Sequence, residues 1–427
     1  MREMKDSGVE WIGEIPSDWQ LTQTRRLFHN EKRIVGDAVD QYERLALTLN
    51  GVIRRSKDDI EGLQPEKFEG YQILKENELV FKMIDLENVN TSRVGISPYT
   101  GLVSPAYIVL TNNSSDNRYA YYWFMFMYYF EIFNHLGGDG VRSALNVKDM
   151  LSMPIPNISQ ENRKRISDYL DSKCSHIDAI IEKQQTIIEK LKEYKLSMIS
   201  EAVTKGIKPD VEMKDSGNRF AEVMPAHWEN RKMITILSMR VIDGPHESPE
   251  LLDDGIPYIS ATAIVNGKID FSLMRGYISE EYCDICDKRY IPQKGDLLVV
   301  KLGAGTGQVA MVETDKRFNI WVPLAAVRCN IEANPKFVYY AFQSDYFLRQ
   351  MELSWTFGTQ QTLGVQTIER LRILLPPKDE QDKIVLYLDK RYEKINKKIE
   401  NIQKVINKLQ EYKKSLIYEV VTGKKEV

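Results

Sequence analysis

The sequence has few cysteines and no long uncharged apolar run, and each shortage excludes a class of protein. Four cysteines among 427 residues cannot form a dense disulfide framework, which favours a reducing compartment. The apolar run at 119–130 is shorter than the roughly 18 residues that span a bilayer, so we expect a buried helix or strand there. Acidic and basic side chains alternate around Trp11 and Trp19, unlike in a secretory signal. We therefore expect a cytoplasmic protein with no membrane partner.

The charge balance also lacks the basic excess of a protein that grips nucleic acid by bulk charge. The formal net charge is -3 at pH 7, and acidic residues outnumber basic ones in the first 150 residues. Any DNA contact must then depend on local clusters of Lys and Arg. A chain of 427 residues is long enough for two or three domains, each with its own core.

What the sequence does have is a repeat of about half its length. The opening segment MKDSGVEWIGEIPSDW, residues 4–19, recurs as MKDSGNRFAEVMPAHW, residues 213–228, at a shift of 209. Residues 169–206 match residues 387–424 at a shift of 218. Two similar copies in one chain predict an internal duplication with a pseudo-twofold arrangement.

Each copy ends in a segment that predicts one long helix. No Pro or Gly interrupts residues 161–205 or 378–422, and apolar residues recur every seventh position, as in a coiled-coil seam. The predicted interface consists of Leu170, Ile177, Ile181, Gln184, Ile188, Leu191 and Met198 in the first helix and Leu388, Ile395, Ile402, Leu409 and Leu416 in the second. Gln184 stands where the second copy has Ile402, and a polar residue there could set the register. Two helices packed only on their own domains are the alternative, but the length of the stripe favours an antiparallel pair.

The segments that precede the helices contain β-type runs bounded by turns. Such runs occur at 77–86 and 101–110 in the first copy and at 255–271, 294–305 and 321–331 in the second. The expected fold class is α+β: two strand-rich mixed α/β domains separated by two long helices that pair as an antiparallel coiled coil. The expected boundaries are 1–155 and 207–376 for the domains and 156–206 and 377–427 for the helices.

Four motifs together identify a family. They are SGVEWIGEIPSDW at 7–19, GDLLVVKLGAGTGQV at 295–309, PPKDEQDKI at 376–384, and YLD at the start of each heptad helix. In this order the chain resembles, over essentially its whole length, the DNA-specificity subunits of type I restriction-modification systems. The resemblance implies two target recognition domains that each read one half of a bipartite double-stranded DNA site. It also implies that the paired helices set the spacer and dock two methyltransferase subunits.

The resemblance further implies a subunit without catalysis of its own, so that S-adenosylmethionine is expected on the partner subunits and no cofactor in this chain. Whether restriction or translocating subunits join the complex is left open by the sequence. A DNA-independent coiled-coil scaffold that bridges proteins is the alternative function, and an enzyme that modifies DNA unaided is a third.

Short motifs that suggest catalysis or metal binding each lack an essential part. SPAY at 104–107 lacks the second proline and the leading amide or acid of a methyltransferase tetrapeptide. GAGTG at 303–307 has neither the ending of a P-loop nor a dinucleotide fingerprint, so we expect a tight strand turn. CDIC at 283–286 has the spacing of half a zinc site but no second pair of ligands nearby in the sequence. PDVEMK at 209–214 has the letters of a nuclease signature, but we expect its acidic residues to lie in a solvent-exposed linker. We expect no catalytic residues and no metal site.

Base readout requires paired donors and acceptors, such as Arg for guanine and Asn or Gln for adenine. Turn-rich polar loops flanked by apolar runs are where we expect them. The predicted DNA-binding residues are Arg54, Arg55, Lys82, Asn88, Asn90, Arg93 and Arg142 in the first half and His246, Lys301, Gln308, Gln360 and Gln361 in the second. Arg142 aligns with Gln360 at the shift of 218. For any one of these residues, a solvated surface position is the competing interpretation.

Overall fold

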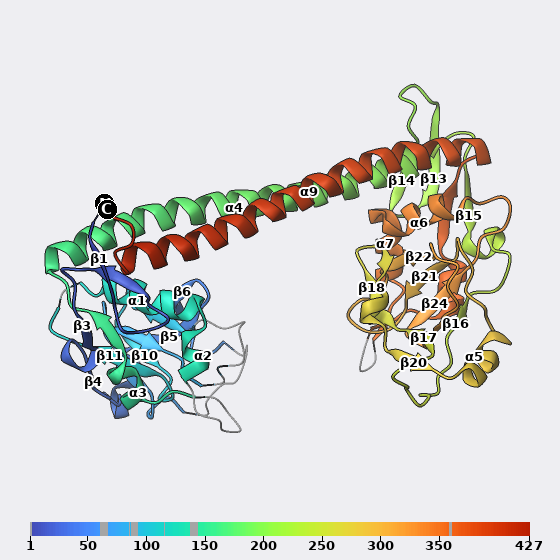
Figure 1. Ribbon diagram of the computed structural model, residues 1–427. Coiled ribbons are helices and arrows are strands. Elements are labelled where there is room, and N and C mark those ends of the chain that lie inside the picture. The colour runs from blue at the N-terminus through green and yellow to red at the C-terminus, as the bar shows by residue number, and fades with distance from the viewer. Residues whose placement is uncertain are drawn as a thin grey trace. The chain divides into compact units, whose positions relative to one another are not determined.

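The computed structural model describes residues 2–59, 67–84, 86, 93–114, 116–136, 144–357 and 361–427. The chain divides into two compact units, one made of Met1–Gln184 with Gln403–Val427 and the other of Gln185–Ile402. The division falls inside two long helices, α4 (Gln160–Lys205) and α9 (Lys378–Val421), which are coloured green and red in Figure 1. Each unit therefore contains a part of both helices.

The first unit is rich in short strands. They are β1 (Met4–Asp6), β2 (Glu14–Pro16), β3 (Leu21–Gln23), β4 (His29–Asn30), β5 (Arg44–Thr48), β6 (Gly51–Arg55), β7 (Gln72–Leu74), β8 (Leu79–Phe81), β9 (Val94–Ile96), β10 (Gly101–Val103), β11 (Ile108–Thr111) and β12 (Pro154–Pro156). Two four-stranded sheets have the orders β6-β5-β10-β7 and β4-β11-β8-β9, and β1-β2 and β12-β3 form two-stranded pairs. Only the β10–β5 pair in the first sheet is parallel.

Helix α1 (Arg118–Tyr129) supplies much of the first core, with α2 (Ile132–Leu136) and α3 (Val147–Ser152) following it. Trp123, Phe124 and Phe126 are fully buried, and the Phe124 ring meets the Phe81 ring edge-on with centroids 5.0 Å apart. A helix that is apolar on nearly all sides must be enclosed by protein, which explains the aromatic run. The prediction of a buried element at 119–130 is confirmed, as a helix.

The second unit contains the remaining strands and helices. The strands are β13 (Met213–Asn218), β14 (Ala221–Pro225), β15 (Glu229–Lys232), β16 (Ile242–Asp243), β17 (Ile256–Ile259), β18 (Ile264–Val265), β19 (Lys268–Ile269), β20 (Gly276–Ile278), β21 (Leu297–Val300), β22 (Val309–Met311), β23 (Asn319–Ile320), β24 (Leu324–Val327), β25 (Thr356–Phe357), β26 (Gln361–Thr362) and β27 (Arg372–Leu375). The helices are α5 (Glu280–Asp287), α6 (Pro335–Gln343), α7 (Asp345–Glu352) and α8 (Val365–Arg370).

The central sheet of the second unit has the order β16-β24-β21-β22, beside a three-stranded sheet β20-β17-β23. Strands β21 and β24 read as continuous apolar runs because both of their faces are buried. Helix α6 packs over this sheet with Phe337, Tyr340 and Phe342 in the core. Strand β15 pairs with β27 immediately before α9, as β3 pairs with β12 immediately before α4.

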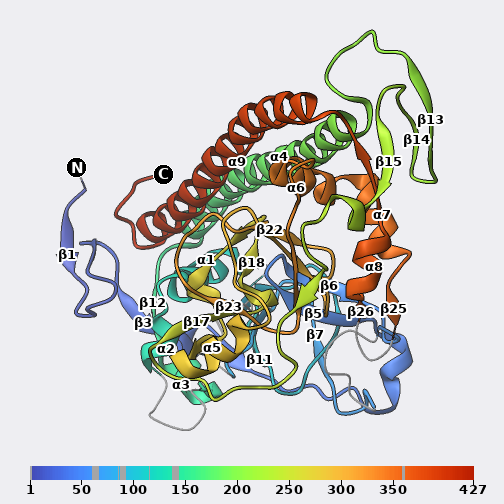
Figure 2. The ribbon, with the colours of Figure 1, turned by 90° about the vertical axis from the view of Figure 1, so that its right-hand side faces the viewer.

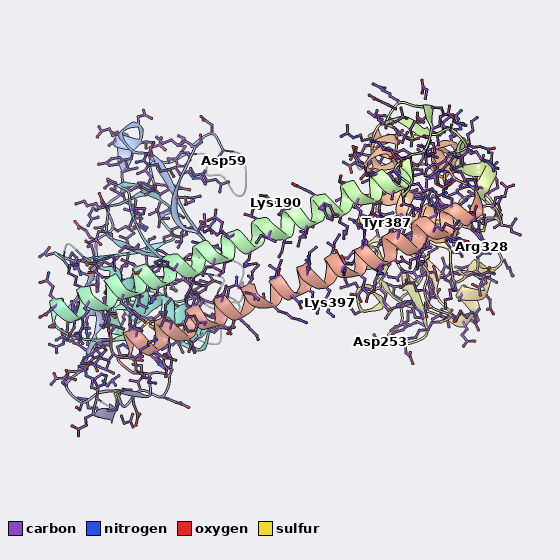
Figure 3. The ribbon with its side chains drawn as sticks, turned by 90° about the horizontal axis from the view of Figure 1, so that it is seen from above. Asp59, Lys190, Asp253, Arg328, Tyr387 and Lys397 are labelled. Carbon is purple, nitrogen blue, oxygen red and sulfur yellow. The ribbon has the colours of Figure 1, made fainter. Side chains whose placement is uncertain are left out.

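The two long helices are each uninterrupted, as the lack of Pro and Gly predicts. Within the first unit, Leu170, Ile177 and Leu416 belong to one buried cluster, and Ile181 and Leu409 pack against it. Within the second unit, Met198, Leu388 and Ile395 share a cluster that Leu191 joins at its edge. Of the other predicted interface residues, Ile188 is buried, whereas Gln184 and Ile402 are half-buried. Figure 3 shows the side chains along both helices, with Lys190 on α4 and Lys397 on α9 labelled.

Polar contacts join α4 to α9 at equivalent places in the two units. Lys413 Nζ lies 2.7 Å from both carboxylate oxygens of Asp178 in the first unit. Lys195 Nζ lies 3.4 Å from Oδ1 of Asn396 in the second. Lys195 and Asp178 each precede their counterparts, Lys413 and Asn396, by 218 positions.

The repeated opening segments pack against the C-terminal turns of the long helices. Trp19 is 3% exposed in one cluster with Leu416 and Val420, and the β1-β2 hairpin lies beside the end of α9 in Figure 2. Trp228 is fully buried in one cluster with Met198 and Ala202 of α4. Each unit thus uses the same Pro and Trp spacing to cover a helix end.

Glycine closes both helices at these contacts. Gly206 and Gly423 have φ of +79° and +74°, a conformation that ends a helix and strains other residues. A Cβ on Gly423 would lie 2.5 Å from Cγ of Pro16, which leaves no room for a side chain.

Candidate nucleic-acid interface

Arg54 and Arg55 lie on β6, an edge strand of the first unit. Arg54 is paired with Glu43 at 3.0 Å, and its guanidinium lies over the Tyr99 ring, 4.4 Å from the centroid. More than half of the Arg54 side chain remains exposed, at 59%. Arg55 Nε lies 2.5 Å from an oxygen of Asp59. The exposed Arg54 can turn to a phosphate or base edge at small cost, because exposed ion pairs contribute little.

Lys82 and Arg93 belong to one loop system at the end of β8. Arg93 is only 2% exposed, and its Nη1 donates to the carbonyl of Ile84 at 2.6 Å. The amide of Lys82 donates to the carbonyl of Arg93 at 3.0 Å, while the Lys82 side chain is half-buried. In this structure Arg93 therefore holds the backbone of the loop, and its contact with DNA stays a prediction.

Four of the predicted contact residues lie outside the described residues. They are Asn88, Asn90, Arg142 and Gln360. Their roles stay predictions.

Asp243 organises a group of basic side chains in the second unit. Its carboxylate is 10% exposed and lies 3.0 Å from Lys301 Nζ and 2.5 Å from Arg289 Nη2. His246 Nε2 lies 3.3 Å from Oδ2 of Asp243, the same oxygen that Lys301 meets, and the His246 side chain is 70% exposed. Lys301 is buried, so burial and its partner hold it in place, whereas Arg289 and His246 extend to solvent. Arg289 and His246 can therefore contact a phosphate while the buried Lys301–Asp243 ion pair stays intact.

The loop that carries His246 starts at a position where only glycine fits. A Cβ on Gly244 would lie 2.2 Å from the carbonyl oxygen of Ile320. The close approach places Gly244 directly against the end of β23. It explains why glycine follows Asp243.

Two loops far apart in the sequence meet next to Lys301. The amide of Gly303 donates to the carbonyl of Gln361 at 3.1 Å, and the amide of Leu363 donates to the carbonyl of Lys301 at 2.8 Å. Gln308 closes the glycine turn and has an exposed side chain, and Gln361 is half-buried. Gly303 and Gly307 have positive φ, so the predicted tight strand turn is confirmed. His246, Lys301, Gln308 and Gln361 therefore lie in one loop region of the second unit.

Sequence reasoning missed several cations that the structure brings forward. Arg289 lies 46 residues from Asp243 in the sequence, and Arg240, 75% exposed, pairs with buried Glu369 at 2.9 Å. Nothing short of the tertiary fold signals these pairings, because each partner comes from a different loop.

A further group on α9 comprises Lys390, Arg391, Lys394 and Lys398, which line a groove of about 490 Å³ with Tyr194 and Tyr387. Their i, i+4 spacing was visible in the sequence as a basic stripe.

The cysteines of CDIC are core residues of α5 and not exposed ligands. Cys283 and Cys286 are 0% and 3% exposed. Burial raises the pKa of the Cys283 thiol to about 11, which disfavours the thiolate that a metal would need. Among the described residues, no group of three or more His, Cys, Asp or Glu could hold a metal ion. No described helix is long and apolar enough to cross a bilayer.

The fold and these loops define a class: a mixed α+β protein with two long helices and polar, cation-bearing loops suited to contact with a polyanion. Residues 240–408 match the family model of the type I restriction modification DNA specificity domain. This match and two relatives that are specificity subunits of type I restriction-modification systems agree with the resemblance that the sequence shows. The matched residues include Asp243, His246, Lys301 and both glutamines of the loop region.

Relatives of the chain include two specificity subunits. One is the type I restriction enzyme EcoBI specificity subunit of Escherichia coli, 24% identical over 62% of this chain and 55% of the relative, so the match spans about half of that protein. Another is the putative type I restriction enzyme MjaX specificity subunit of Methanocaldococcus jannaschii, 22% identical over 97% of this chain and 95% of the relative. The fold is similar to a chain in a solved structure on complex assembly and conformational transition of the type I R-M system. That chain has a TM-score of 0.66 and 14% identity, with 95% of this chain and 98% of the other covered.

Proposed function

We propose that this chain is the non-catalytic DNA-sequence specificity subunit of a type I complex and that each half reads one part of a bipartite site. The recognition domains would be residues 1–155 and 207–376. The helical segments 156–206 and 377–427 would pair as an antiparallel coiled coil that sets the spacer. Two methyltransferase subunits, which would carry the S-adenosylmethionine, would dock on this frame.

The observation that carries the proposal is a set of contacts that recurs at a fixed shift. In the first unit Arg118 and Tyr122 bind Asp171 of α4, with distances of 2.5 Å and 2.6 Å. In the second unit Lys336 and Tyr340 bind Asp389 of α9, at 2.8 Å and 2.6 Å. Each residue has its counterpart 218 positions later. Equivalent contacts support an internal duplication in which each domain is mounted in the same way on its helix.

The loops between the mountings differ, and this difference supports two unlike half-sites. The loop region with Gln308 and Gln361 offers amide side chains that can pair with adenine, whereas Arg54 in the first unit offers a donor pair for guanine. A bipartite site with two different half-sites requires two domains that are attached to their helices in the same way but have different DNA-contacting loops.

The heptad positions of α4 and α9 support the coiled coil. Their apolar members are buried or half-buried within each unit, and the polar contacts Lys413–Asp178 and Lys195–Asn396 recur between the two helices at the shift of 218. The division of the chain into units falls inside both helices, so pairing along their length would fix the distance between the recognition domains.

Methylation mapping in cells that express the chain with its methyltransferase partners tests the proposal. The double variant Gln308→Ala with Gln361→Ala should change or relax one half of the methylated site and leave the other half and the spacer unchanged. Gln403→Ala, an exposed glutamine on α9, is the matched control and should leave the whole site unchanged. A methylated site that has no second half would contradict the proposal.

A scaffold that bridges proteins without touching DNA is the alternative. Footprinting of the purified assembly separates the two, because a scaffold protects no defined sequence. Protection of two short segments with an unprotected gap supports the specificity subunit.

A further inference from the structure

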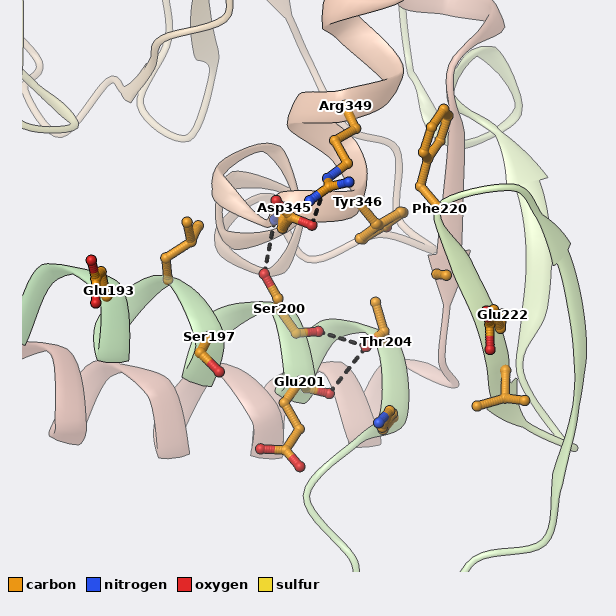
Figure 4. A pocket seen from close by; sticks show the side chains of 14 residues that line it. Glu193, Ser197, Ser200, Glu201, Thr204, Phe220, Glu222, Asp345, Tyr346 and Arg349 are labelled. Carbon is orange, nitrogen blue, oxygen red and sulfur yellow. Dashed lines mark hydrogen bonds and ion pairs between the residues drawn. The ribbon is translucent and has the colours of Figure 1, made fainter. Parts of the chain in front are cut away.

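A groove of about 820 Å³ opens in the second unit between the last turns of α4, the β13-β14 hairpin and α7 (Figure 4). Ser197 and Ser200 of α4 form its floor, and Phe220 lines the side toward the hairpin. Ser200 Oγ accepts a hydrogen bond of 2.8 Å from the amide of Asp345 at the start of α7. The floor is therefore built from small side chains held by a fixed hydrogen bond.

The equivalent place in the first unit is filled by aromatic rings. Tyr418, the counterpart of Ser200 at the shift of 218, lies 5.0 Å from the Phe126 ring and 5.2 Å from the Phe130 ring, centroid to centroid. Trp11 completes the group 5.9 Å from Phe126. These four residues, Trp11, Phe126, Phe130 and Tyr418, are called the aromatic plug.

Every member of the aromatic plug has a smaller counterpart in the second unit. Tyr418 corresponds to Ser200, Phe126 to Ser344 and Phe130 to Leu348, all at the shift of 218. Trp11 corresponds to Phe220 at the shift of 209. The replacements remove three rings, and two of the four smaller counterparts, Ser200 and Phe220, line the groove. The helix also breaks here, because Ser344 separates α6 from α7 where α1 continues unbroken.

The rim of the groove carries more negative than positive charge. Glu193, Glu201 and Glu222 line it and, among the described residues, have no cation within ion-pair distance. Asp345 is paired with Arg349 at 2.9 Å, so these two largely cancel. Lys205 also lines the groove, so its four carboxylates outnumber its two cations. This excess around an apolar wall favours a cationic ligand with an apolar centre.

We propose that this groove binds an aromatic side chain of a partner protein, on a segment with lysine or arginine at both sides. The aromatic plug of the first unit shows which ring the shape accepts, and the carboxylates fix the charge of the flanks. Because the first unit supplies its own rings, the described part of the chain forms one such site and engages that partner on one half. The inference does not depend on which DNA sequence the loops read.

Calorimetric titration of the full chain tests the site with a synthetic peptide that has one tyrosine between two pairs of lysines. We expect one equivalent to bind saturably. A peptide with alanine in place of the tyrosine should bind at least tenfold more weakly, and so should one with glutamates in place of the lysines.

Variants of the chain locate the binding. Ser197→Tyr and Ser200→Tyr should each weaken binding of the tyrosine peptide at least tenfold by filling the groove. Ser197 is exposed, so its variant keeps the Ser200–Asp345 hydrogen bond and should melt at the same temperature as the original chain. Ser175→Tyr, at an exposed position of α4 in the first unit, is the matched control and should bind normally.

Several results would overturn the site. They are the absence of saturable binding, equal binding of the alanine peptide, and unchanged binding by the folded Ser197→Tyr chain. Sedimentation velocity measures whether the chain self-associates through the groove. Self-association that Ser197→Tyr abolishes would identify a second copy of the chain as the occupant and would reject a different partner protein.

Discussion

The hydroxyl of Tyr340 donates a hydrogen bond of 2.6 Å to one carboxylate oxygen of Asp389, and Lys336 meets the other oxygen at 2.8 Å. The contact ties α6, in the core of the second unit, to α9 at Asp389. Burial, followed by the hydrogen bond to Asp389, raises the pKa of Tyr340, so the phenol stays protonated and continues to donate. The equivalent pair in the first unit is Tyr122 with Asp171.

Removal of this hydroxyl should destabilise the second unit. We expect Tyr340→Phe to lower the free energy of unfolding by about 1.5–3 kcal/mol, since the bond is made to a charged acceptor. Urea denaturation of the purified chain measures the change. Tyr412→Phe, with a ring 52% exposed on α9, should change stability by less than about 0.5 kcal/mol. Equal effects of the two variants would show that the Asp389 contact is not stabilising.

Arg289 and His246 should each contribute a phosphate contact if the Asp243 group faces DNA. Arg289→Gln should weaken DNA binding by the assembled complex and reduce the slope of log affinity against log salt concentration by about 1. Fluorescence anisotropy across a salt series provides both quantities. Lys208→Gln, at an exposed position between α4 and β13, should leave affinity and slope unchanged. A normal slope in Arg289→Gln would place the DNA elsewhere.

Acid should weaken the first unit through Glu78. Burial acts to raise the pKa of Glu78, but hydrogen bonds from Arg33, at 2.8 Å and 2.9 Å, and from the Lys75 amide outweigh it, and the pKa lies below the ordinary value of 4.5. A lowered pKa in the folded chain means that this contribution is complete above pH 4.5 and is lost as the pH falls through the folded value.

Glu78→Gln should therefore lower the free energy of unfolding by about 1–3 kcal/mol at neutral pH. The difference from the original chain should shrink as the pH falls well below 4.5, where the original carboxylate also becomes neutral. Denaturation at a series of pH values tests this, with Glu76→Gln, an exposed neighbour, as the control. A difference that is constant with pH would mean that the charge of Glu78 plays no part.

The coiled-coil proposal makes a quantitative prediction about the spacer. Removal of one heptad from each helix, residues 181–187 and 399–405, shortens a paired frame by about 10 Å, since each helical residue rises about 1.5 Å. Base pairs are about 3.4 Å apart, so the spacer of the methylated site should shrink by about three base pairs, or methylation should stop. Seven residues inserted after Asp210, in the connection between α4 and β13, should leave the spacer unchanged. An unaltered spacer after the double deletion would reject a helical ruler.

The helices and their mounting could be predicted because their signals are local. Long stretches without Pro or Gly gave α4 and α9 almost to the residue, and the repeated Pro and Trp of the opening segments marked a shared packing role. The packing itself was not predictable. Nothing in the opening segment says that Trp19 covers a helix end some 400 residues later, because that contact is set by tertiary folding.

The candidate interface was predicted in part. Loop composition identified His246, Gln308 and Gln361, and the fold brings them near Lys301 through contacts between segments about 60 residues apart. Composition could not separate an exposed arginine from a buried one, so Arg54 and Arg93 received the same prediction although one is exposed and the other holds a loop from inside. Burial depends on which strands cover a loop, and single-sequence patterns do not carry that information.

The four thiols have a practical consequence for labelling. None is in a disulfide; Cys174, Cys283 and Cys286 are buried, and burial raises the pKa of Cys174 to about 11 and that of Cys329 to about 12. Maleimide dyes react with thiolates, which these sites scarcely form at neutral pH. A single cysteine introduced at exposed Gln308 would therefore take up a fluorophore selectively without removal of the natural ones. Such a probe would report directly on whether the glycine turn meets a duplex.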